Sequence, residues 1–314
     1  MLRYTLSVRT AFFPAAAVAI TALVCSLAAA RGAPAKFATT SAAQQAKDAA
    51  KKIKDRPIQW DPPNINGRLR SVSASPPCNV TDVLKQAGAR AQELADNVPN
   101  FTADERIQYR ALDLMGSVVD AASGTFEYLA LFVPEGGGWT VQETRTPLAG
   151  THTFPASAQD IGLPELAFIF LPRYQGDYEM ACEGAAPWNG QAAWVIHFQQ
   201  RPDKPAEMIR VAGTKYSLKL KGRAWLAADS GEVLHLESGI LEPIPSRGMR
   251  NWWISIDYGP VQFPRQNARM WLPQTVDAYA EFDTVRTIIY HTFADFMMFS
   301  VHTRQEVQKP TEPH

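Results

Sequence analysis

Histidine is the residue type in this chain best suited to acid–base or metal chemistry near neutral pH. The chain has six: His152, His197, His235, His291, His302 and His314. None lies at a metal-ligand spacing from another, and no cysteine accompanies them. His291 lies near Asp295, so a base with an orienting carboxylate is one interpretation, and a half-buried strand histidine is the simpler one. His235 alternates with apolar neighbours beside Glu237 and is expected to be solvated.

Closely spaced carboxylates are the next candidates for chemistry. Asp177, Glu179 and Glu183 lie along one side of an expected strand. A pair of carboxylates can hydrolyse a glycosidic bond, but the pair must face each other across a cleft, and spacing along one strand does not show this. We therefore interpret them as a solvated face. The chain also lacks the serine-elbow, phosphate-loop, zinc-protease and C-x-x-C motifs. The sequence predicts no catalytic residue, no metal ligand and no cofactor.

The first thirty residues have the pattern of a secretory signal peptide. Arg3 and Arg9 precede an uncharged apolar run over residues 11–30, and small-residue cleavage sites follow at Ala28–Ala30 and Ala33–Ala35. A membrane anchor is the alternative, since twenty apolar residues can cross a bilayer. We expect removal of residues 1–30, a periplasmic or secreted location, and a mature chain that is not integral to the membrane.

The net charge narrows the possible partners, and the cysteine count predicts a disulfide. The whole chain has 31 basic and 31 acidic residues, and loss of residues 1–30 removes two arginines. A near-neutral mature chain gives no electrostatic reason to bind nucleic acid. Only Cys78 and Cys182 remain after cleavage, and in an oxidising compartment they are expected to form a disulfide, with two separate buried thiols as the alternative.

Composition divides the mature chain into three parts. Residues 31–77, first rich in Ala and Lys and then in Pro, are expected to be a flexible tether with little to bury. Residues 78–303 form the predicted domain, and residues 304–314 a disordered tail. An amphipathic helix should open the domain, because apolar residues recur at three- and four-residue steps from Val80 to Val98, and Pro99 ends it.

Most of the domain has the alternation of β-strands. Residues 101–111 alternate apolar and polar, and similar runs follow around Trp194, Leu234, Trp252 and Val276. Turn signals separate the runs, including the glycines at 136–138 and Asn189–Gly190. One late segment, residues 163–170, is expected to be helical. The predicted fold is α+β: a strongly curved or incompletely closed antiparallel β-barrel of about ten strands, with an N-terminal amphipathic helix and one or two short helices as a lid.

Large side chains on these strands suggest a cavity. Aromatic residues are common in filled cores, but a curved sheet covered by a helix can also enclose an apolar cavity. The candidate cavity-lining residues are Trp194, Ile196, Phe198, Leu234, Leu236, Trp252 and Ile254. The candidate lid residues are Val83, Leu84, Leu94, Leu166 and Phe170.

Several short sequence segments carry a resemblance to known proteins. They are residues 97–103 (NVPNFTA), 176–180 (GDYEM), 220–225 (LKGRAW), 258–261 (YGPV), 271–274 (WLPQ) and 291–296 (HTFADF). With them the chain resembles, over residues 78–302, a family of uncharacterised exported bacterial proteins. The order of one helix followed by a run of hairpins is similar in layout to the LolA, LolB and RseB periplasmic lipoprotein-carrier barrels. That resemblance implies binding of acyl chains or lipoproteins, and it assigns no individual residue.

Three hypotheses for function follow. The first is non-catalytic binding of an apolar or lipid-linked ligand, with lipid or lipoprotein acyl chains as partners. The second is an envelope protein-interaction or sensing module without a ligand cavity, and the third is a hydrolase of unknown class. A hollow concave face favours the first. A cleft that gathers His291 with carboxylates from other strands favours the third.

Overall fold

A computed structural model of the protein describes residues 56–299, apart from residues 68, 70–71, 74–76, 98–99, 136–137, 149–153, 156–164 and 212–213. The expected signal peptide, residues 31–55 of the expected tether and the expected tail lie outside the described residues. In the described part of the chain, no helix combines the length and the apolar character needed to cross a membrane.

The elements follow one another as one helix, many strands and a few short helical turns. In chain order they are α2 (Val80–Asn97), β1 (Asn100–Leu112), β2 (Val118–Glu135), β3 (Gly138–Pro147), the 3₁₀ helix η2 (Glu165–Phe170), α3 (Pro172–Gln175), β4 (Tyr178–Ala185), β5 (Ala193–Gln200), β6 (Glu207–Val211), β7 (Thr214–Leu218), β8 (Leu220–Ala227), β9 (Val233–Ile240), η3 (Pro245–Arg247), β10 (Met249–Phe263), β11 (Ala268–Phe282) and β12 (Arg286–Met298).

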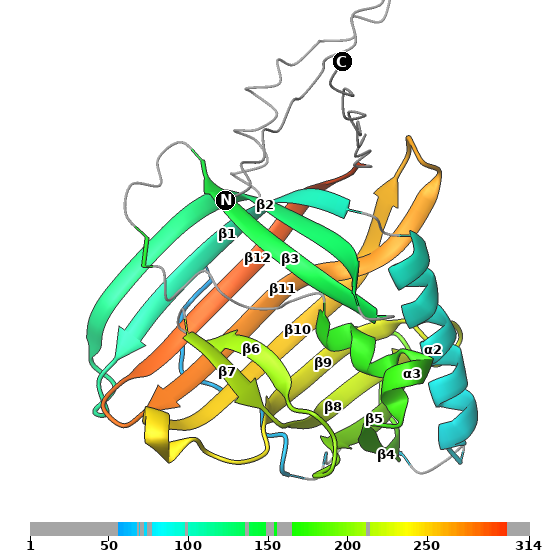
Figure 1. The fold of residues 1–314 in the computed structure, drawn as a ribbon, viewed down its shortest axis with the longest axis horizontal. Helices are drawn as coiled ribbons and strands as arrows, with labels where there is room; N and C mark the ends of the chain where they lie inside the picture. The colour runs from blue at the N-terminus through cyan, green and yellow to red at the C-terminus, as the bar shows by residue number, and fades with distance from the viewer. Residues whose placement is uncertain are drawn as a thin grey trace, which may run out of the picture. The chain divides into compact units, whose positions relative to one another are not determined.

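Ten of the strands form a single antiparallel sheet, in the order β3-β2-β1-β12-β11-β10-β9-β8-β5-β4 (Figure 1). The edge strands β3 and β4 do not pair with each other, so the sheet is not closed into a barrel. Strands β6 and β7 form a separate two-stranded ribbon. The predicted fold class, an incompletely closed antiparallel sheet of about ten strands with few helices, is confirmed.

Local patterns explain the strands and turns. In β1 the odd positions from Phe101 to Ala111 are buried and the even positions are half-buried, as the alternation predicted. Asn189 and Gly190 have positive φ angles of 47° and 81° and lie between β4 and β5, as expected for a tight hairpin turn. Glu135 pairs with Gly138 across β2 and β3, as a hairpin at this point of the chain requires, and residues 136–137 lie outside the described residues.

Helices cover one face of the sheet, which we call the core face. Val83, Ala87, Ala91 and Ala95 of α2 are buried at three- and four-residue steps in the main apolar cluster. η2 packs beside α2, which confirms the predicted late helical segment. The Cys78–Cys182 disulfide joins the residue before the helix cap to β4, with the two Cα atoms 6.3 Å apart, so the expected pairing is confirmed.

Residues 56–67, which we call the strap, cover the opposite face. Trp60 packs edge-on against Trp253 and Tyr279, with ring centroids 6.0 Å and 5.7 Å apart. Ile65 is only 2% exposed, and Arg223 donates a hydrogen bond from Nη1 to the Asn64 carbonyl at 2.9 Å. The expectation that this part of the tether has little to bury is therefore wrong. A proline-rich extended segment has the shape needed to lie along a sheet face, and its few apolar side chains fill spaces between strands.

Candidate functional site

A groove of about 570 Å³ lies between α2 and the β10–β11 hairpin. Its helical wall is the stretch from Ala87 to Leu94, and its sheet wall includes Tyr258 and the start of β11. The turn before β9 also lines the groove. A volume of this size falls within the roughly 300–1,000 Å³ typical of sites for small molecules.

Small side chains on the helix leave the space open. Ala87 and Ala91 lie one turn apart on the buried face of α2, where larger residues would reach the sheet. Opposite them, Met270 and Trp271 of β11 supply apolar surface, and Leu94 and Met298 add to it. Aliphatic and aromatic side chains therefore form part of the walls, beside polar and charged ones.

Charged residues surround this apolar part. Arg90 donates from Nε to the Ser230 carbonyl at 3.0 Å, pairs with Glu93 at 2.5 Å and lies 3.7 Å from Glu232. Arg269 is exposed at the groove and has no charged partner among the described residues. The four charged lining residues carry two positive and two negative charges, so the lining is neutral overall.

Two buried polar atoms of the lining have no hydrogen-bond partner within the described structure: the Tyr258 hydroxyl and Glu232 Oε2. Tyr258 is 7% exposed, and burial raises the pKa of its hydroxyl, which keeps that group protonated. Buried polar groups are normally paired. Both atoms are themselves closed to water, so this unused hydrogen-bonding capacity lies behind the groove surface and not on it.

The lid and cavity-lining residues predicted from the sequence lie in several parts of the structure. Of the lid residues, Leu94 lines the groove, Val83, Leu166 and Phe170 are buried in the main cluster, and Leu84 is partly buried against it. Of the cavity candidates, the main cluster contains Ile196, Phe198, Leu236, Trp252 and Ile254, with Trp194 partly buried against it. None of the seven lines the groove.

Leu234 belongs to a different cluster from the other six candidates. A bulge interrupts the β8–β9 ladder, where Trp225 pairs with His235 but Leu226 pairs with Val233. The extra residue breaks strict alternation, so Leu234 and His235 pack on the same side instead of on opposite sides.

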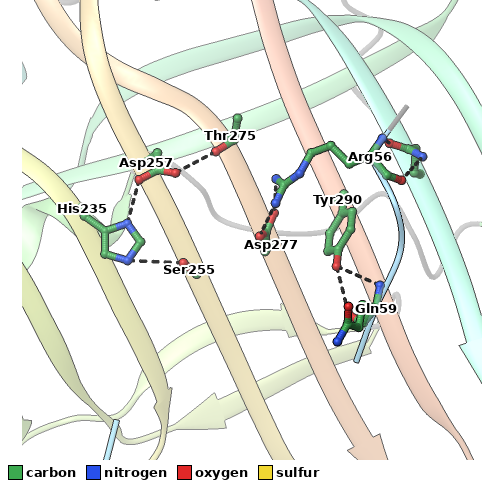
Figure 2. Close-up of polar contacts among 9 residues, drawn as sticks. Arg56, Gln59, His235, Ser255, Asp257, Thr275, Asp277 and Tyr290 are labelled. Carbon is green, nitrogen blue, oxygen red and sulfur yellow. Dashed lines mark hydrogen bonds and ion pairs between the residues drawn. The ribbon is translucent and has the colours of Figure 1, made fainter. Parts of the chain in front are cut away.

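His235 is 3% exposed, so the expectation of a solvated surface histidine is wrong. Its ring stacks on Trp188 with centroids 3.7 Å apart, and its Nδ1 lies 2.9 Å from Asp257. Figure 2 shows that this pair begins a row of polar groups across β9, β10 and β11, which ends where Arg56 of the strap binds both carboxylate oxygens of Asp277.

Part of this row has the order of a Ser–His–Asp triad. Ser255 Oγ lies 3.4 Å from His235 Nε2, on the ring side opposite Asp257 (Figure 2). However, Glu237 competes for Nε2 at 3.5 Å. Ser255 lies in a central strand paired on both sides, so neighbouring backbone N–H groups serve the ladder instead of an oxyanion hole. The arrangement is suited to holding neighbouring strands together on this face of the sheet, and not to acyl transfer.

Protonation of His235 is expected to stabilise the fold. Burial lowers the pKa of His235, but hydrogen bonds to Asp257 and Glu237 outweigh burial and raise it above the ordinary value. A raised folded-state pKa contributes stability that is complete below the unfolded value of about 6.5 and is lost as the pH rises through the folded value. We predict that the unfolding free energy lost in His235→Gln is larger at pH 6 than at pH 9, measured by urea denaturation. A pH-independent loss would contradict this.

A second buried polar group lies on the core face. Glu105 and His291 are both 0% exposed, and Nδ1 of His291 lies 2.7 Å from Glu105. Arg145 donates to both Glu105 oxygens, at 2.6 Å and 3.0 Å. His291 therefore pairs with a carboxylate from another strand and not with Asp295, the orienting residue considered from the sequence.

This group does not form a cleft. Its two central side chains are fully enclosed, so a substrate cannot reach them, and the condition that favours a hydrolase is not met. The acidic residues considered from the sequence also have structural partners: Asp177 pairs with Lys204, Glu179 with Arg201, and Glu183 with Arg223. In the described part of the chain, no group of three or more His, Cys, Asp or Glu side chains is arranged to hold a metal ion.

Comparison with known proteins gives likeness of layout only. No family model matches the chain. No curated protein matches it by sequence. Among solved structures, the chain is similar to a DUF1329 family protein from Desulfovibrio piger, with 8% identity and a TM-score of 0.38 over 70% of this chain and 92% of that chain.

Two further solved structures are similar. One is a putative outer membrane lipoprotein-sorting protein domain from Vibrio parahaemolyticus, with 13% identity and a TM-score of 0.40 over 70% of this chain and 93% of that chain. The other is lipoprotein LppX from Mycobacterium tuberculosis, with 7% identity and a TM-score of 0.22 over 69% and 97%. TM-scores this low assign no function.

Proposed function

We propose that this protein is a non-catalytic binding protein for an apolar or lipid-linked ligand, which it holds in the groove between α2 and the β10–β11 hairpin. The groove itself is the observation that supports this function. The proposal includes the predicted location: an exported protein that acts in the periplasm or outside the cell, with lipid or lipoprotein acyl chains as partners.

The energetics favour a chain-like ligand. Burial of apolar carbon releases about 0.8 kcal/mol per methylene, so ten methylenes against the apolar walls would contribute about 8 kcal/mol. Part of that gain offsets the loss of translational and rotational freedom on binding. That loss costs about 4–15 kcal/mol, a range that brackets the gain, so apolar burial alone gives weak and reversible binding.

A variant that fills the groove should abolish binding. Ala268 lines the groove and is only partly buried, so Ala268→Trp would place an indole ring in the ligand's space. We expect the affinity for the neutral fluorescent dye Nile red to fall at least tenfold, measured by fluorescence titration of the purified protein.

Ala121→Trp is the matched control, because Ala121 is exposed on β2 and does not line the groove. Its dye affinity should equal that of the unchanged protein. Equal binding by both tryptophan variants would show that the dye binds elsewhere, and the proposed function would then lack support.

The second candidate, a protein-interaction module, is favoured by the β1–β2 hairpin tip. Leu114, Met115, Val118 and Val119 are 49%, 90%, 52% and 61% exposed. The Asp113 carboxylate accepts hydrogen bonds from the backbone N–H groups of Met115 and Ser117, which holds the turn in shape. An intact groove with no ligand affinity, together with an envelope protein captured through this tip, would favour this candidate.

A further inference from the structure

The tip of the β1–β2 hairpin extends beyond the layers that cover the rest of the sheet. Every residue from 114 to 121 is exposed, whereas a strand covered on one face buries alternate side chains, as β1 does from Phe101 to Ala111. In the described part of the chain, neither the strap nor the helices cover this tip. Its large apolar side chains are those of Leu114, Met115, Val118 and Val119.

The backbone of the turn is already paired within the turn. The N–H of Asp113 donates to the Ser117 carbonyl at 2.9 Å, and the N–H of Gly116 donates to the Asp113 carbonyl at 3.0 Å. The Asp113 carboxylate accepts the N–H groups of Met115 and Ser117, at 2.9 Å and 2.8 Å. Backbone that enters an apolar medium must be paired internally, because an unpaired N–H is costly there. These four N–H groups can leave water without losing a partner.

The size of the tip favours a lipid bilayer over a protein partner. Exposed apolar surface of this kind marks contact with one or the other. A stable protein–protein interface takes roughly 20–30 residues from each side, whereas the tip offers four apolar side chains on a single hairpin. Contact between the tips of two copies of this chain would be equally small. A bilayer needs no matching surface, because its fluid interior can surround a projecting tip on every side.

Charge specifies the kind of bilayer. Asp113 and Asp120 are the only charged residues from Leu112 to Ala121. Arg286, at the adjoining end of β12, is paired with Glu281 at 2.8 Å. Anionic lipids attract clusters of basic residues, so this acidic segment disfavours an anionic surface. Asp113 is half-buried and Asp120 is exposed, which lets both carboxylates stay at the level of the head groups.

We propose that the β1–β2 hairpin tip inserts its apolar side chains into a lipid bilayer whose head groups carry no net charge, and so attaches the protein to a membrane surface. The groove lies at the other end of the long strands. β11 begins at the groove with Ala268, and its far end pairs with the start of β12 beside the tip (Figure 1). Insertion therefore leaves the groove in water, and the proposal does not depend on the groove binding a ligand.

Methionine oxidation tests insertion in the protein without its expected signal peptide, residues 31–314. Met115 at the tip is 90% exposed and Met297 is 63% exposed, and Met297 lies at the other end of β1, where it pairs with Thr102. Hydrogen peroxide converts exposed methionines to sulfoxides, which mass spectrometry locates. We expect saturating phosphatidylcholine vesicles to slow oxidation of Met115 at least tenfold and to leave the rate at Met297 unchanged within about twofold.

Met115→Glu and Met297→Glu are matched variants, because each places a carboxylate at an exposed methionine. In a flotation assay with phosphatidylcholine vesicles, we expect Met115→Glu to lower the partition coefficient at least tenfold and Met297→Glu to leave it unchanged. Both should melt at the temperature of the unchanged protein. Binding of the unchanged protein should not weaken between about 0.1 M and about 1 M salt, because salt screens charges and does not weaken apolar burial.

Four results would overturn the proposal. If vesicles do not protect Met115, the tip does not enter the bilayer and is left to the protein-interaction candidate. If Met297→Glu weakens vesicle binding as much as Met115→Glu, attachment uses another surface. If binding requires anionic phosphatidylglycerol and is lost in high salt, attachment is electrostatic. If Met115 becomes protected without vesicles as the protein concentration rises, a second copy covers the tip. None of these results affects dye binding in the groove, so the proposed function is tested separately.

Discussion

Arg145→Met is expected to lower the free energy of unfolding by about 3–5 kcal/mol, since removal of one member of a buried ion pair leaves the other charge uncompensated. Arg145 is 5% exposed and holds Glu105, which is fully buried. Methionine keeps most of the side-chain length, so the loss reports mainly on charge. Urea denaturation at pH 7 gives the measurement.

Arg250→Met is the control for Arg145→Met. Arg250 pairs with Asp283, but the two side chains are 62% and 59% exposed, and such pairs contribute at most about 1 kcal/mol. If both variants lose the same unfolding free energy, water must reach the Glu105 site.

Lowering the pH should reduce the difference in unfolding free energy between Arg145→Met and the unchanged protein. Burial alone would raise the pKa of Glu105, but Arg145 and His291 outweigh burial and lower it. Stability from a lowered carboxyl pKa is present above the unfolded value of about 4.3 and is lost as the pH falls through the folded value. Burial also lowers the pKa of His291, so both proteins lose stability as the pH falls below about 6.5. This loss is common to the two proteins and leaves the difference between them unchanged.

Replacing both Cys78 and Cys182 with alanine is the other change with a large expected effect. The disulfide joins residues 104 apart in the sequence, and closing a loop of that length stabilises a fold by about 4–5 kcal/mol in the chain-entropy model. We expect the double variant to lose about that much unfolding free energy in urea.

Reduction of the unchanged protein by dithiothreitol should reproduce this loss, and dithiothreitol should leave the alanine variant unaffected. A loss below about 1 kcal/mol would show that the two ends stay close in the unfolded chain, so that the covalent bond removes little entropy from it.

The sequence predicted those features that depend on local patterns. Alternation from Phe101 to Ala111 identified β1, and helical periodicity identified α2, because one buried face is enough to produce either pattern. The disulfide followed from the count, since only two cysteines remain after the expected cleavage. Glu105 also left a signal: it lies at an odd position of β1, among buried neighbours, where a carboxylate needs a partner.

Features that depend on register or on distant segments could not be predicted. The bulge that turns His235 into a buried residue is a property of how β9 pairs with β8, and neither strand shows it alone. The groove draws on α2, on the turn before β9 and on the β10–β11 hairpin, which are far apart in the sequence. Trp60 and Ile65 are apolar, but only the folded sheet provides the surface that covers them.

The strap has a practical consequence for where the folding unit begins. A fragment that starts at Cys78 would lack Arg56 and Trp60, and Asp277, Trp253 and Tyr279 would lose the groups that cover them. Such a truncated domain would present an uncovered aromatic surface and be prone to self-association. We therefore expect a stable version of this protein to start no later than Arg56.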